Sequence, residues 1–286
     1  MKTSQHRLVV FVLGAAVSVP LAIAAGATLS GVAGGLAPVT TAALVSALIA
    51  GLLLGLAHVM LRRDGLSLGA LGLPADRRRW RELSVGLAVM AALTAGIALS
   101  QSLAVGAPWE FQGLPGVRAA IVALPLVAAM VFAEELLFRG VALRYLRDAW
   151  GDRAAIGVTA AAFGVYHVVG THNWAMGLVF QFLMPSLAGA LFAWAAIRSG
   201  GLSLPIGLHL GANWVQAAVA GFDAGGANAT VFAIWRIPVS AADVQLLTAP
   251  DVIVRLPHLT ALALAAVMTW MLLRRAAAER AAAPLH

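Results

Sequence analysis

The chain has 286 residues, of which 61% are hydrophobic and 11% are charged. A soluble domain is typically about 45–50% apolar and about 25% charged, so this composition excludes a soluble globular fold and predicts an integral membrane protein. The net charge is +7, but there is no room for a soluble domain and we expect no nucleic-acid partner. Cysteine is absent, which excludes disulfides, a thiolate nucleophile and thiolate metal ligands.

Eight stretches of the chain approach the length of about 20 mostly apolar residues that a membrane-spanning helix needs. They cover residues 8–30, 36–61, 83–105, 119–138, 154–169, 174–197, 202–220 and 259–273. Apolar character on all sides is typical of helices surrounded by lipid and by other helices. The predicted fold class is therefore all-α, a polytopic transmembrane helical bundle of about eight spans. Residues 106–118 and 221–257 are expected to be outer loops.

Basic residues are distributed unevenly between the predicted connections. Arg and Lys favour cytoplasmic loops, and with the N-terminus inside, 15 of the 19 basic residues fall in cytoplasmic segments. Only Arg118, Arg236 and Arg255 fall in outer segments. This bias predicts that both termini are cytoplasmic, and the Ala- and Arg-rich composition favours a bacterial inner (plasma) membrane. The basic loop 62–82 is expected to lie along the anionic inner leaflet.

The order of these segments predicts three parts. Residues 1–118 would hold the first three spans and the basic cytoplasmic loop. Residues 119–220 would form a core of four spans, and residues 221–286 an outer loop, the last span and a cytoplasmic tail. Lys2 and Arg7 before an apolar run also fit a cleavable signal peptide, but the run is long for one, so an uncleaved first helix is expected.

Glu134 and Glu135 are the two of the 12 acidic residues that lie inside an apolar stretch. Insertion scales assign a charged side chain at a helix centre about 2.5–3.5 kcal/mol, so such residues usually have a partner or a function. Glu135 precedes Arg139 by four residues, the favourable order for a helical ion pair, and we assign it that structural role. Glu134 points about 100° away around the helix, which leaves a functional role or snorkelling toward the cytoplasmic edge.

Two of the seven histidines, His167 and His209, also lie inside apolar stretches. Asn213 follows His209 by four residues, so both side chains share one helix face. Such a pair can donate hydrogen bonds to an oxyanion or hold helices together. Phe163 precedes His167 by four residues and is expected to pack beside it. Because polar groups in a membrane face one another or a water-filled cavity, the three helices are predicted to share one cavity.

The depth of these groups gives one further expectation. At 1.5 Å per residue, Glu134 and His209 lie roughly 6 and 10 Å from the inner ends of their spans, whereas His167 lies roughly 20 Å along its helix from residue 154. The helix that carries His167 is therefore expected to extend below the membrane plane, around Asp152 and Arg153.

Three short motifs carry these residues, each on its own predicted helix. They are Glu134-Glu135-Leu-Leu-Phe-Arg139, Phe163-Gly-Val-Tyr-His167 and His209-Leu-Gly-Ala-Asn213. Their order resembles the motifs E-E-x-x-x-R, F-x-x-x-H and H-x-x-x-N of the CPBP family. This family comprises CAAX-protease-like intramembrane endopeptidases, including type II CAAX prenyl endopeptidases and bacteriocin-processing or self-immunity proteins. The resemblance covers roughly residues 119–220.

The resemblance implies an intramembrane endopeptidase that hydrolyses a peptide bond in a membrane-associated protein or peptide, prenylated in the CAAX case. It implies that the catalytic residues are Glu134, His167, His209 and Asn213, with Glu135, Arg139 and Phe163 in support. Glu134 would activate a water with the help of His167. His209 and Asn213 would stabilise the oxyanion of the tetrahedral intermediate.

The cofactor and two other functions stay open on the sequence. Glu134, His167 and His209 could hold a catalytic divalent metal such as zinc, with an open fourth position, or the reaction could need no metal. The chain also fits a non-catalytic immunity or assembly protein of the same family, or a proton-coupled transporter, since transporters also use membrane carboxylates. The expected partners are a membrane-associated substrate and the lipid bilayer.

Overall fold

The computed structural model describes residues 2–34, 38–171, 178–223, 233–248 and 252–282. The helices are α1 (Lys2–Val32), α2 (Pro38–Arg63), α3 (Arg77–Val105), α4 (Gly113–Arg139), α5 (Val141–Thr171), α6 (Leu178–Ser199), α7 (Ser203–Trp214) and α9 (Val252–Ala282). Within the described residues, each predicted span lies on a helix except the seventh, 202–220, which continues beyond α7 into a π-helical turn and the first residue of a short strand. The predicted all-α membrane bundle is confirmed.

Five stretches of the described residues are long and apolar enough to cross a membrane. They are Ser4–Val32, Thr40–Arg63, Arg77–Val105, Gly113–Val169 and Gln181–Ser199. The fourth is 57 residues long and contains α4 and nearly all of α5. The apolar part of α9, Leu256–Met271, is shorter, and α7 has 12 residues before a π-helical turn, Val215–Val219, continues it.

The connection between α2 and α3 is shorter than the predicted loop 62–82, because α3 begins inside it. Asp76 caps α3, and its carboxylate accepts a hydrogen bond from the backbone N–H of Arg79 at 2.9 Å. A side-chain acceptor at this position satisfies one of the free N–H groups of a first helical turn. Gly106 ends α3 in the left-handed region with φ 66°, where glycine is favoured. A single 3-10 turn, η1 (Leu68–Leu71), lies in the connection.

Gly151 divides α5 into two helical parts. Its φ of 80° and ψ of 171° are non-helical and strongly favour glycine. The first part, residues 141–150, buries Tyr145 and exposes Arg144 and Arg147, a pattern typical of an amphipathic surface helix. The second part begins directly after the glycine, so the helix that carries His167 starts earlier than residue 154, as its depth predicted.

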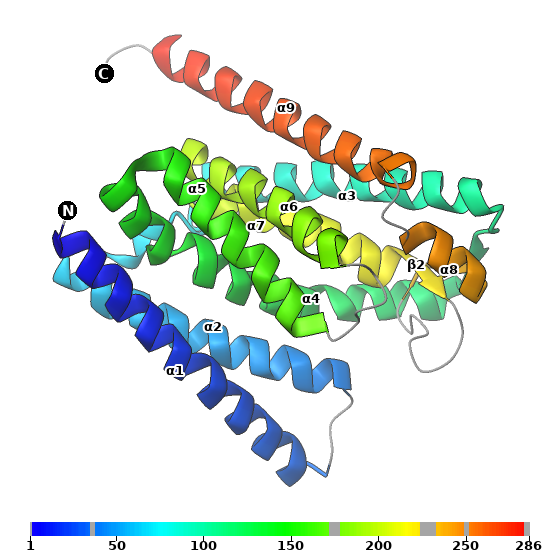
Figure 1. Ribbon diagram of the computed structural model, residues 1–286, viewed down its shortest axis with the longest axis horizontal. Coiled ribbons are helices and arrows are strands. Elements are labelled where there is room, and N and C mark those ends of the chain that lie inside the picture. The colour runs from blue at the N-terminus through cyan, green and yellow to red at the C-terminus, as the bar shows by residue number, and fades with distance from the viewer. Residues whose placement is uncertain (1, 35–37, 172–177, 224–232, 249–251, 283–286) are drawn as a thin grey trace.

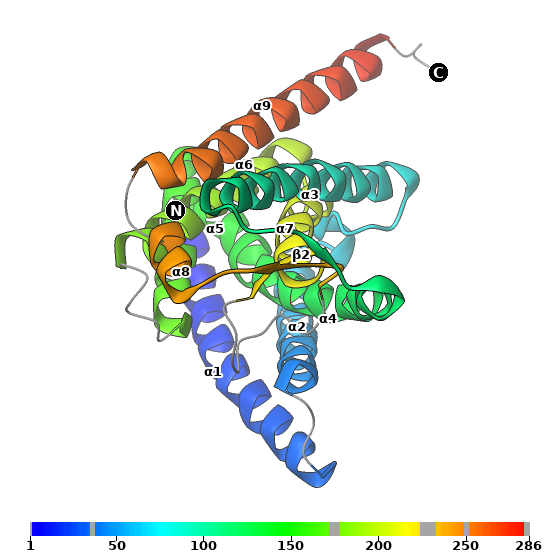
Figure 2. The ribbon, with the colours of Figure 1, turned by 90° about the vertical axis from the view of Figure 1, so that its right-hand side faces the viewer.

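Helix α7 occupies the centre of the bundle, between α3 and α4 (Figure 2). Helices α1 and α2 pack as a pair against α4 and α5, and α9 lies against α3 and α6 on the opposite side (Figure 1). Gly207 and Gly211 let the backbone of α7 touch that of α3, because a Cβ at these positions would collide with the carbonyl oxygens of Leu83 and Leu87. Small residues spaced in this way allow close helix approach in membranes.

The prediction of loops at residues 106–118 and 221–257 was wrong for most of the residues that the structure describes. Three short strands form a sheet in the order β1-β3-β2. They are β1 (Glu110–Phe111), β2 (Ala220–Asp223) and β3 (Trp235–Pro238). Strands of two to four residues are too short for an alternating pattern to be recognised in the sequence. Aromatic packing stabilises them, with the Phe111 and Trp235 ring centroids 5.1 Å apart.

The rest of the predicted outer loop 221–257 is also partly helical. It contains α8 (Ala241–Thr248) and the beginning of α9 at Val252. Ser240 and Asp243 form a capping pair at the start of α8: the hydroxyl and backbone N–H of Ser240 both donate to the Asp243 carboxylate at 2.7 Å. These hydrogen bonds lower the pKa of Asp243, because they favour its ionised form.

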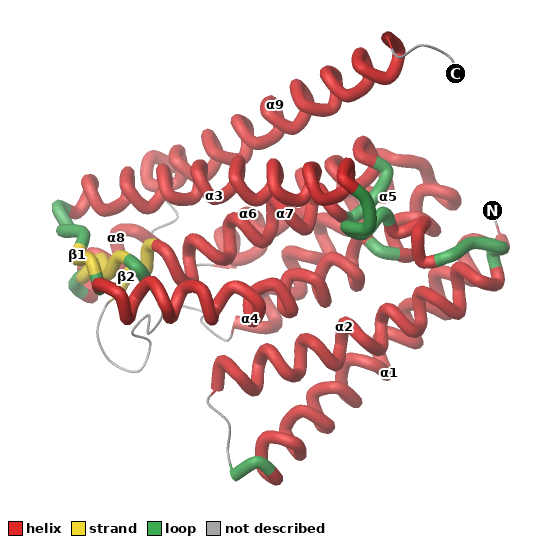
Figure 3. Tube along the Cα trace, turned by 180° about the vertical axis from the view of Figure 1, so that it is seen from behind, coloured by secondary structure: helices red, strands yellow, loops and turns green. Residues whose placement is uncertain are grey.

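The sheet and the ends of the described chain lie at opposite ends of the bundle. Figure 3 shows the strands at one end, while the first turn of α1 and the last turn of α9 lie at the other, together with the connections from α2 to α3 and from α4 to α5. The two ends of the described chain lie together when the helices cross the bundle an even number of times. The side of the membrane that each end faces stays a prediction.

Candidate active site

Three helices bring their polar side chains to one place in the bundle. Helix α4 carries Glu134 and Glu135, α5 carries His167, and α7 carries His209 and Asn213. The two glutamates lie in the last turns of α4, and His209 lies on a helix whose residues from Ser203 to Gly211 are all buried.

Glu135 is fully buried, and one of its carboxylate oxygens accepts hydrogen bonds from both Arg139 and His209. Its Oε1 accepts a hydrogen bond from Arg139 at 2.9 Å, and both side chains are 0% exposed. The same Oε1 lies 2.8 Å from His209 Nδ1, so the Nδ1–H of His209 donates to it. The predicted Glu135–Arg139 ion pair is confirmed. The contact with His209 was not predicted, and it gives Glu135 a second task, because a carboxylate on one imidazole nitrogen fixes the orientation of the ring.

Glu134 faces the other side of the same imidazole. Its Oε2 lies 3.6 Å from His209 Nε2, and the carboxylate is 16% exposed. This oxygen is buried and has no hydrogen-bond partner among the residues that the structure describes. The hydroxyl of Tyr166, one residue before His167, contacts the Glu134 carboxylate. Glu134 therefore keeps a lone pair that can accept a proton from a water, which a general base must do.

Asn213 shares a helix face with His209, as the spacing of four residues predicted. Its Nδ2 lies 3.3 Å from His209 Nε2. Two N–H donors held side by side can bind one developing negative charge, as in an oxyanion hole. The Glu134 carboxylate lies on the same side of the ring, so a water held by Glu134 and a carbonyl oxygen near Asn213 would be close to each other.

His167 joins the site through aromatic contacts. Its Nδ1 lies 2.9 Å from the backbone oxygen of Phe163, and the two ring centroids are 4.4 Å apart. The predicted packing of Phe163 beside His167 is confirmed. The Phe163 ring also lies 5.6 Å from the His209 ring and 4.3 Å from the Arg139 guanidinium carbon. Phe163 thus contacts three polar members of the site and holds their spacing.

Sequence reasoning missed three residues that shape the site. Phe192 of α6 stacks on His209, with ring centroids 4.9 Å apart and planes at 22°. The backbone oxygen of Gly189 accepts a hydrogen bond from Arg139 at 3.2 Å. Tyr166 was missed as well, although it lies within the Phe163–His167 motif. Phe192 and Gly189 lie in an apolar helix, where nothing in the sequence separates them from packing residues.

The predicted metal ligands do not form a metal centre. Within the described parts of the chain, no three His, Cys, Asp or Glu side chains come together as a group that could hold a metal ion. Glu135 holds His209 Nδ1, and Glu134 Oε2 lies 3.6 Å from Nε2. The His167 Nδ1 is instead directed at the Phe163 backbone oxygen. Zinc sites need three protein ligands with their donor atoms directed at one point, and this arrangement does not fit that requirement.

Comparison with protein families places the central part of the chain. Residues 116–215 match the family described as type II CAAX prenyl endopeptidase Rce1-like. The match confirms the resemblance to CPBP proteins, which was predicted from three motifs that all lie inside the matched segment. Comparisons with curated proteins and with solved structures give no match.

The Rce1-like family is one of membrane proteases, so the match supports protease activity in an integral membrane protein. It covers α4, α5, α6 and α7, the helices that surround the candidate site.

Proposed function

We propose that the protein is an intramembrane endopeptidase that cleaves a membrane-associated peptide or protein with a glutamate-activated water and without a metal. One observation carries this proposal. The buried Glu135 holds His209 at 2.8 Å, while the adjacent Glu134 keeps an unpaired carboxylate oxygen 3.6 Å from the other nitrogen of that ring. Glu135 is 0% exposed and holds both Arg139 and His209 through its Oε1. Glu134 is 16% exposed, so its carboxylate is the one that a water can reach.

The charges of the site support this division. To donate from Nε2 while Nδ1 donates to Glu135, the His209 ring must carry two protons. Glu135 and Glu134 lie on its two sides as counter-charges, and Arg139 balances the second carboxylate. The four side chains together are then neutral, which limits the cost of burying charge.

The reaction follows from these positions. Glu134 accepts a proton from a water, whose oxygen attacks the scissile carbonyl carbon and forms a C–O bond. His209 Nε2–H and Asn213 Nδ2–H donate to the resulting oxyanion. The proton on Glu134 passes to the leaving nitrogen as the C–N bond breaks, which restores the carboxylate. His167 is proposed to help Glu134 position the water.

The family match also guides the proposed substrate and location. The matched family is described by its action on CAAX prenyl substrates, so a prenylated CAAX peptide is the first substrate to test. We further propose that the protein lies in a bacterial inner membrane with both termini in the cytoplasm, because most basic residues fall at the end of the bundle that holds the ends of the chain.

Cleavage of quenched fluorescent peptides by purified protein tests this proposal. The panel includes prenylated CAAX peptides, and the variants are Glu134→Gln and, as a control, Glu110→Gln. Glu110 is exposed at the far end of the bundle, so its change removes a carboxylate without touching the site. We expect wild type and Glu110→Gln to cleave and Glu134→Gln to lose about 10²–10⁴-fold in rate, the usual contribution of a general base.

A chelator provides the test of metal dependence. The proposal predicts that activity survives EDTA and is not raised by added Zn²⁺. Loss of activity with EDTA and its return with Zn²⁺ would contradict the metal-free mechanism. Biological function retained in cells by Glu134→Gln would instead favour the non-catalytic immunity or assembly role.

A further inference from the structure

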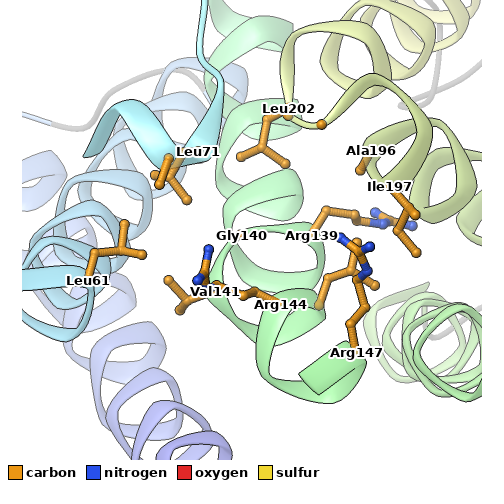
Figure 4. Close-up of a pocket in the computed structure, with 14 residues that line it drawn as sticks. Leu61, Leu71, Arg139, Gly140, Val141, Arg144, Arg147, Ala196, Ile197 and Leu202 are labelled. Carbon is orange, nitrogen blue, oxygen red and sulfur yellow. The ribbon is translucent and has the colours of Figure 1, made fainter. Parts of the chain in front are cut away.

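A separate cavity of about 190 Å³ opens beside the candidate active site, where α4 meets α5 (Figure 4). Residues of α2, η1, α4, α5, α6 and the connection from α6 to α7 contribute to its walls. Three arginines line it, Arg139, Arg144 and Arg147, and its described walls contain no carboxylate. The volume is several times the roughly 30 Å³ that one liquid water occupies, so the cavity can hold a group larger than water.

Arg139 adds a fixed positive charge close to the cavity. It is fully buried, and two of its nitrogens donate to Glu135 and to the Gly189 carbonyl. Its Nε is also buried but has no hydrogen-bond partner among the described residues. The whole Arg139 side chain is 0% exposed, so a group in the cavity would not form a hydrogen bond with it. The residue lines the cavity, and its charge lies behind the cavity wall.

The other two arginines add positive charge that protein groups only partly neutralise. Arg147 donates from Nε to Asp152 at 2.8 Å, in a pair that is 39% and 55% exposed. Arg144 has no ion-pair partner in the described part of the chain. The Gly200 carbonyl on the cavity wall already accepts a hydrogen bond from Arg79 at 2.9 Å, which reduces its repulsion of an anion.

We propose that this cavity binds a phosphate group, supplied by an anionic phospholipid headgroup or by free phosphate. Arginine is suited to phosphate, because its planar group donates parallel hydrogen bonds to two oxygens. The cavity lies at the end of the bundle that carries the basic connection, and basic pockets between membrane helices commonly bind lipid headgroups. The adjoining amphipathic helix 141–150 ends in Trp150, which is 48% exposed and is a residue type enriched at membrane interfaces.

Lipid retention by the purified full-length protein tests the proposal. The variants are the double substitution Arg144→Gln with Arg147→Gln, and Arg81→Gln as a matched control. Arg81 is exposed in the first turn of α3 and does not line the cavity. After delipidation, each protein is mixed with equal amounts of phosphatidylglycerol and phosphatidylcholine, and the bound lipid is measured by native mass spectrometry. Wild type and Arg81→Gln should retain at least tenfold more phosphatidylglycerol, and the double variant less than twofold more.

A second measurement separates the two sources of phosphate. Thermal unfolding is followed in detergent with inorganic phosphate or with chloride at equal ionic strength. A higher unfolding temperature of wild type in phosphate, absent in the double variant, would identify free phosphate as a ligand. Lipid preference without this shift would identify the headgroup. Equal behaviour of wild type and the double variant in both measurements, or an equal loss in Arg81→Gln, would overturn the proposal.

Two features keep this test independent of the peptidase proposal. The double variant should fold, because its targets are exposed and an exposed ion pair contributes only about 0–1 kcal/mol; its unfolding temperature in chloride checks this. Glu134→Gln should bind phosphatidylglycerol like wild type, since the cavity does not contain Glu134. Anion binding therefore does not depend on the peptidase mechanism, although Arg139 contacts both the cavity and the Glu135–His209 pair.

Discussion

The two faces of α7 show how one residue spacing serves opposite purposes. Toward α3, Gly207 and Gly211 remove side chains, so that backbone touches backbone. Toward α4, His209 and Asn213 have the same spacing of four residues and present polar groups to the two glutamates. The glycine face leaves α7 no room to move toward α3, and this fixes the distance between His209 and α4. Precise positioning of a catalytic group depends on such rigid support.

The difference predicts two kinds of mutational effect. Changes on the glycine face should reduce folding stability. They should reduce activity only because less of the protein is folded. Changes on the polar face should reduce activity while the fold persists, except where a buried charge loses its partner. The adjacent pair Glu134 and Glu135 allows the second rule and its exception to be compared directly.

Glu135→Gln should have the largest effect. It removes the counter-charge of the buried Arg139 and the acceptor of His209 Nδ1–H at once. Removing one partner of a buried ion pair typically costs about 3–5 kcal/mol, so we expect a large loss of thermal stability together with loss of peptide cleavage. Thermal unfolding in detergent and the fluorescent peptide assay measure the two effects.

The control for this experiment is the neighbouring substitution Glu134→Gln. Glu134 is 16% exposed, and its Oε2 lies 3.6 Å from His209 Nε2, beyond hydrogen-bond distance. Its change should therefore lower the unfolding temperature much less than Glu135→Gln does. If Glu135→Gln were as stable as Glu134→Gln, the assignment of Glu135 to structural support would be wrong.

Asn213→Ala should reduce activity without disturbing the buried charges of the site. It removes an N–H donor 3.3 Å from His209 Nε2 and leaves the ion pair intact. Loss of one oxyanion donor typically reduces kcat by about 10²–10³-fold. We expect this loss in kcat with KM little changed, at an unfolding temperature close to that of wild type. A change confined to KM would place Asn213 in substrate binding rather than in oxyanion stabilisation.

Gly207→Ala disturbs the glycine face of α7, where α7 packs against α3. The added Cβ would collide with the Leu83 backbone oxygen, and overpacking of this kind typically costs about 1–3 kcal/mol. We expect a lower unfolding temperature and a proportionate loss of active protein. Gly96→Ala on α3 is the matched control, because nothing lies within 4 Å of a Cβ there. That change should be neutral or stabilising by about 0.5–1 kcal/mol, and equal destabilisation by both variants would contradict the packing argument.

The sequence predicted the helical bundle, and it singled out most residues of the candidate site, because both depend on local signals. Glu134, Glu135, His167 and His209 were found because charged and polar residues are rare in apolar stretches. The Glu135–Arg139 pair was predictable because its two members are four residues apart on one helix. These inferences need no knowledge of how the helices pack.

Contacts between different helices could not be predicted from the sequence. The pairing of Glu135 with His209 joins α4 to α7, and the stacking of Phe192 on His209 joins α6 to α7. Neither follows from spacing along one helix. The arginine-lined cavity is formed by five separate elements and the connection from α6 to α7. The short strands were missed because their pairing, such as Phe111 with Trp235, is tertiary.

Tyr166→Phe is the smallest and most selective change to the polar face. The substitution keeps the aromatic ring, which lies 5.5 Å from Phe138 and 5.4 Å from His167 by ring centroids, and removes only the hydroxyl that contacts Glu134. A single hydrogen bond contributes about 0.5–1.5 kcal/mol net, so kcat/KM should fall by up to about tenfold with stability unchanged. Tyr166→Leu removes the ring as well and should lower both activity and unfolding temperature. If Tyr166→Phe cleaves as fast as wild type while Tyr166→Leu does not, Tyr166 supports the site by packing alone, and Glu134 needs no hydroxyl beside it to act on water.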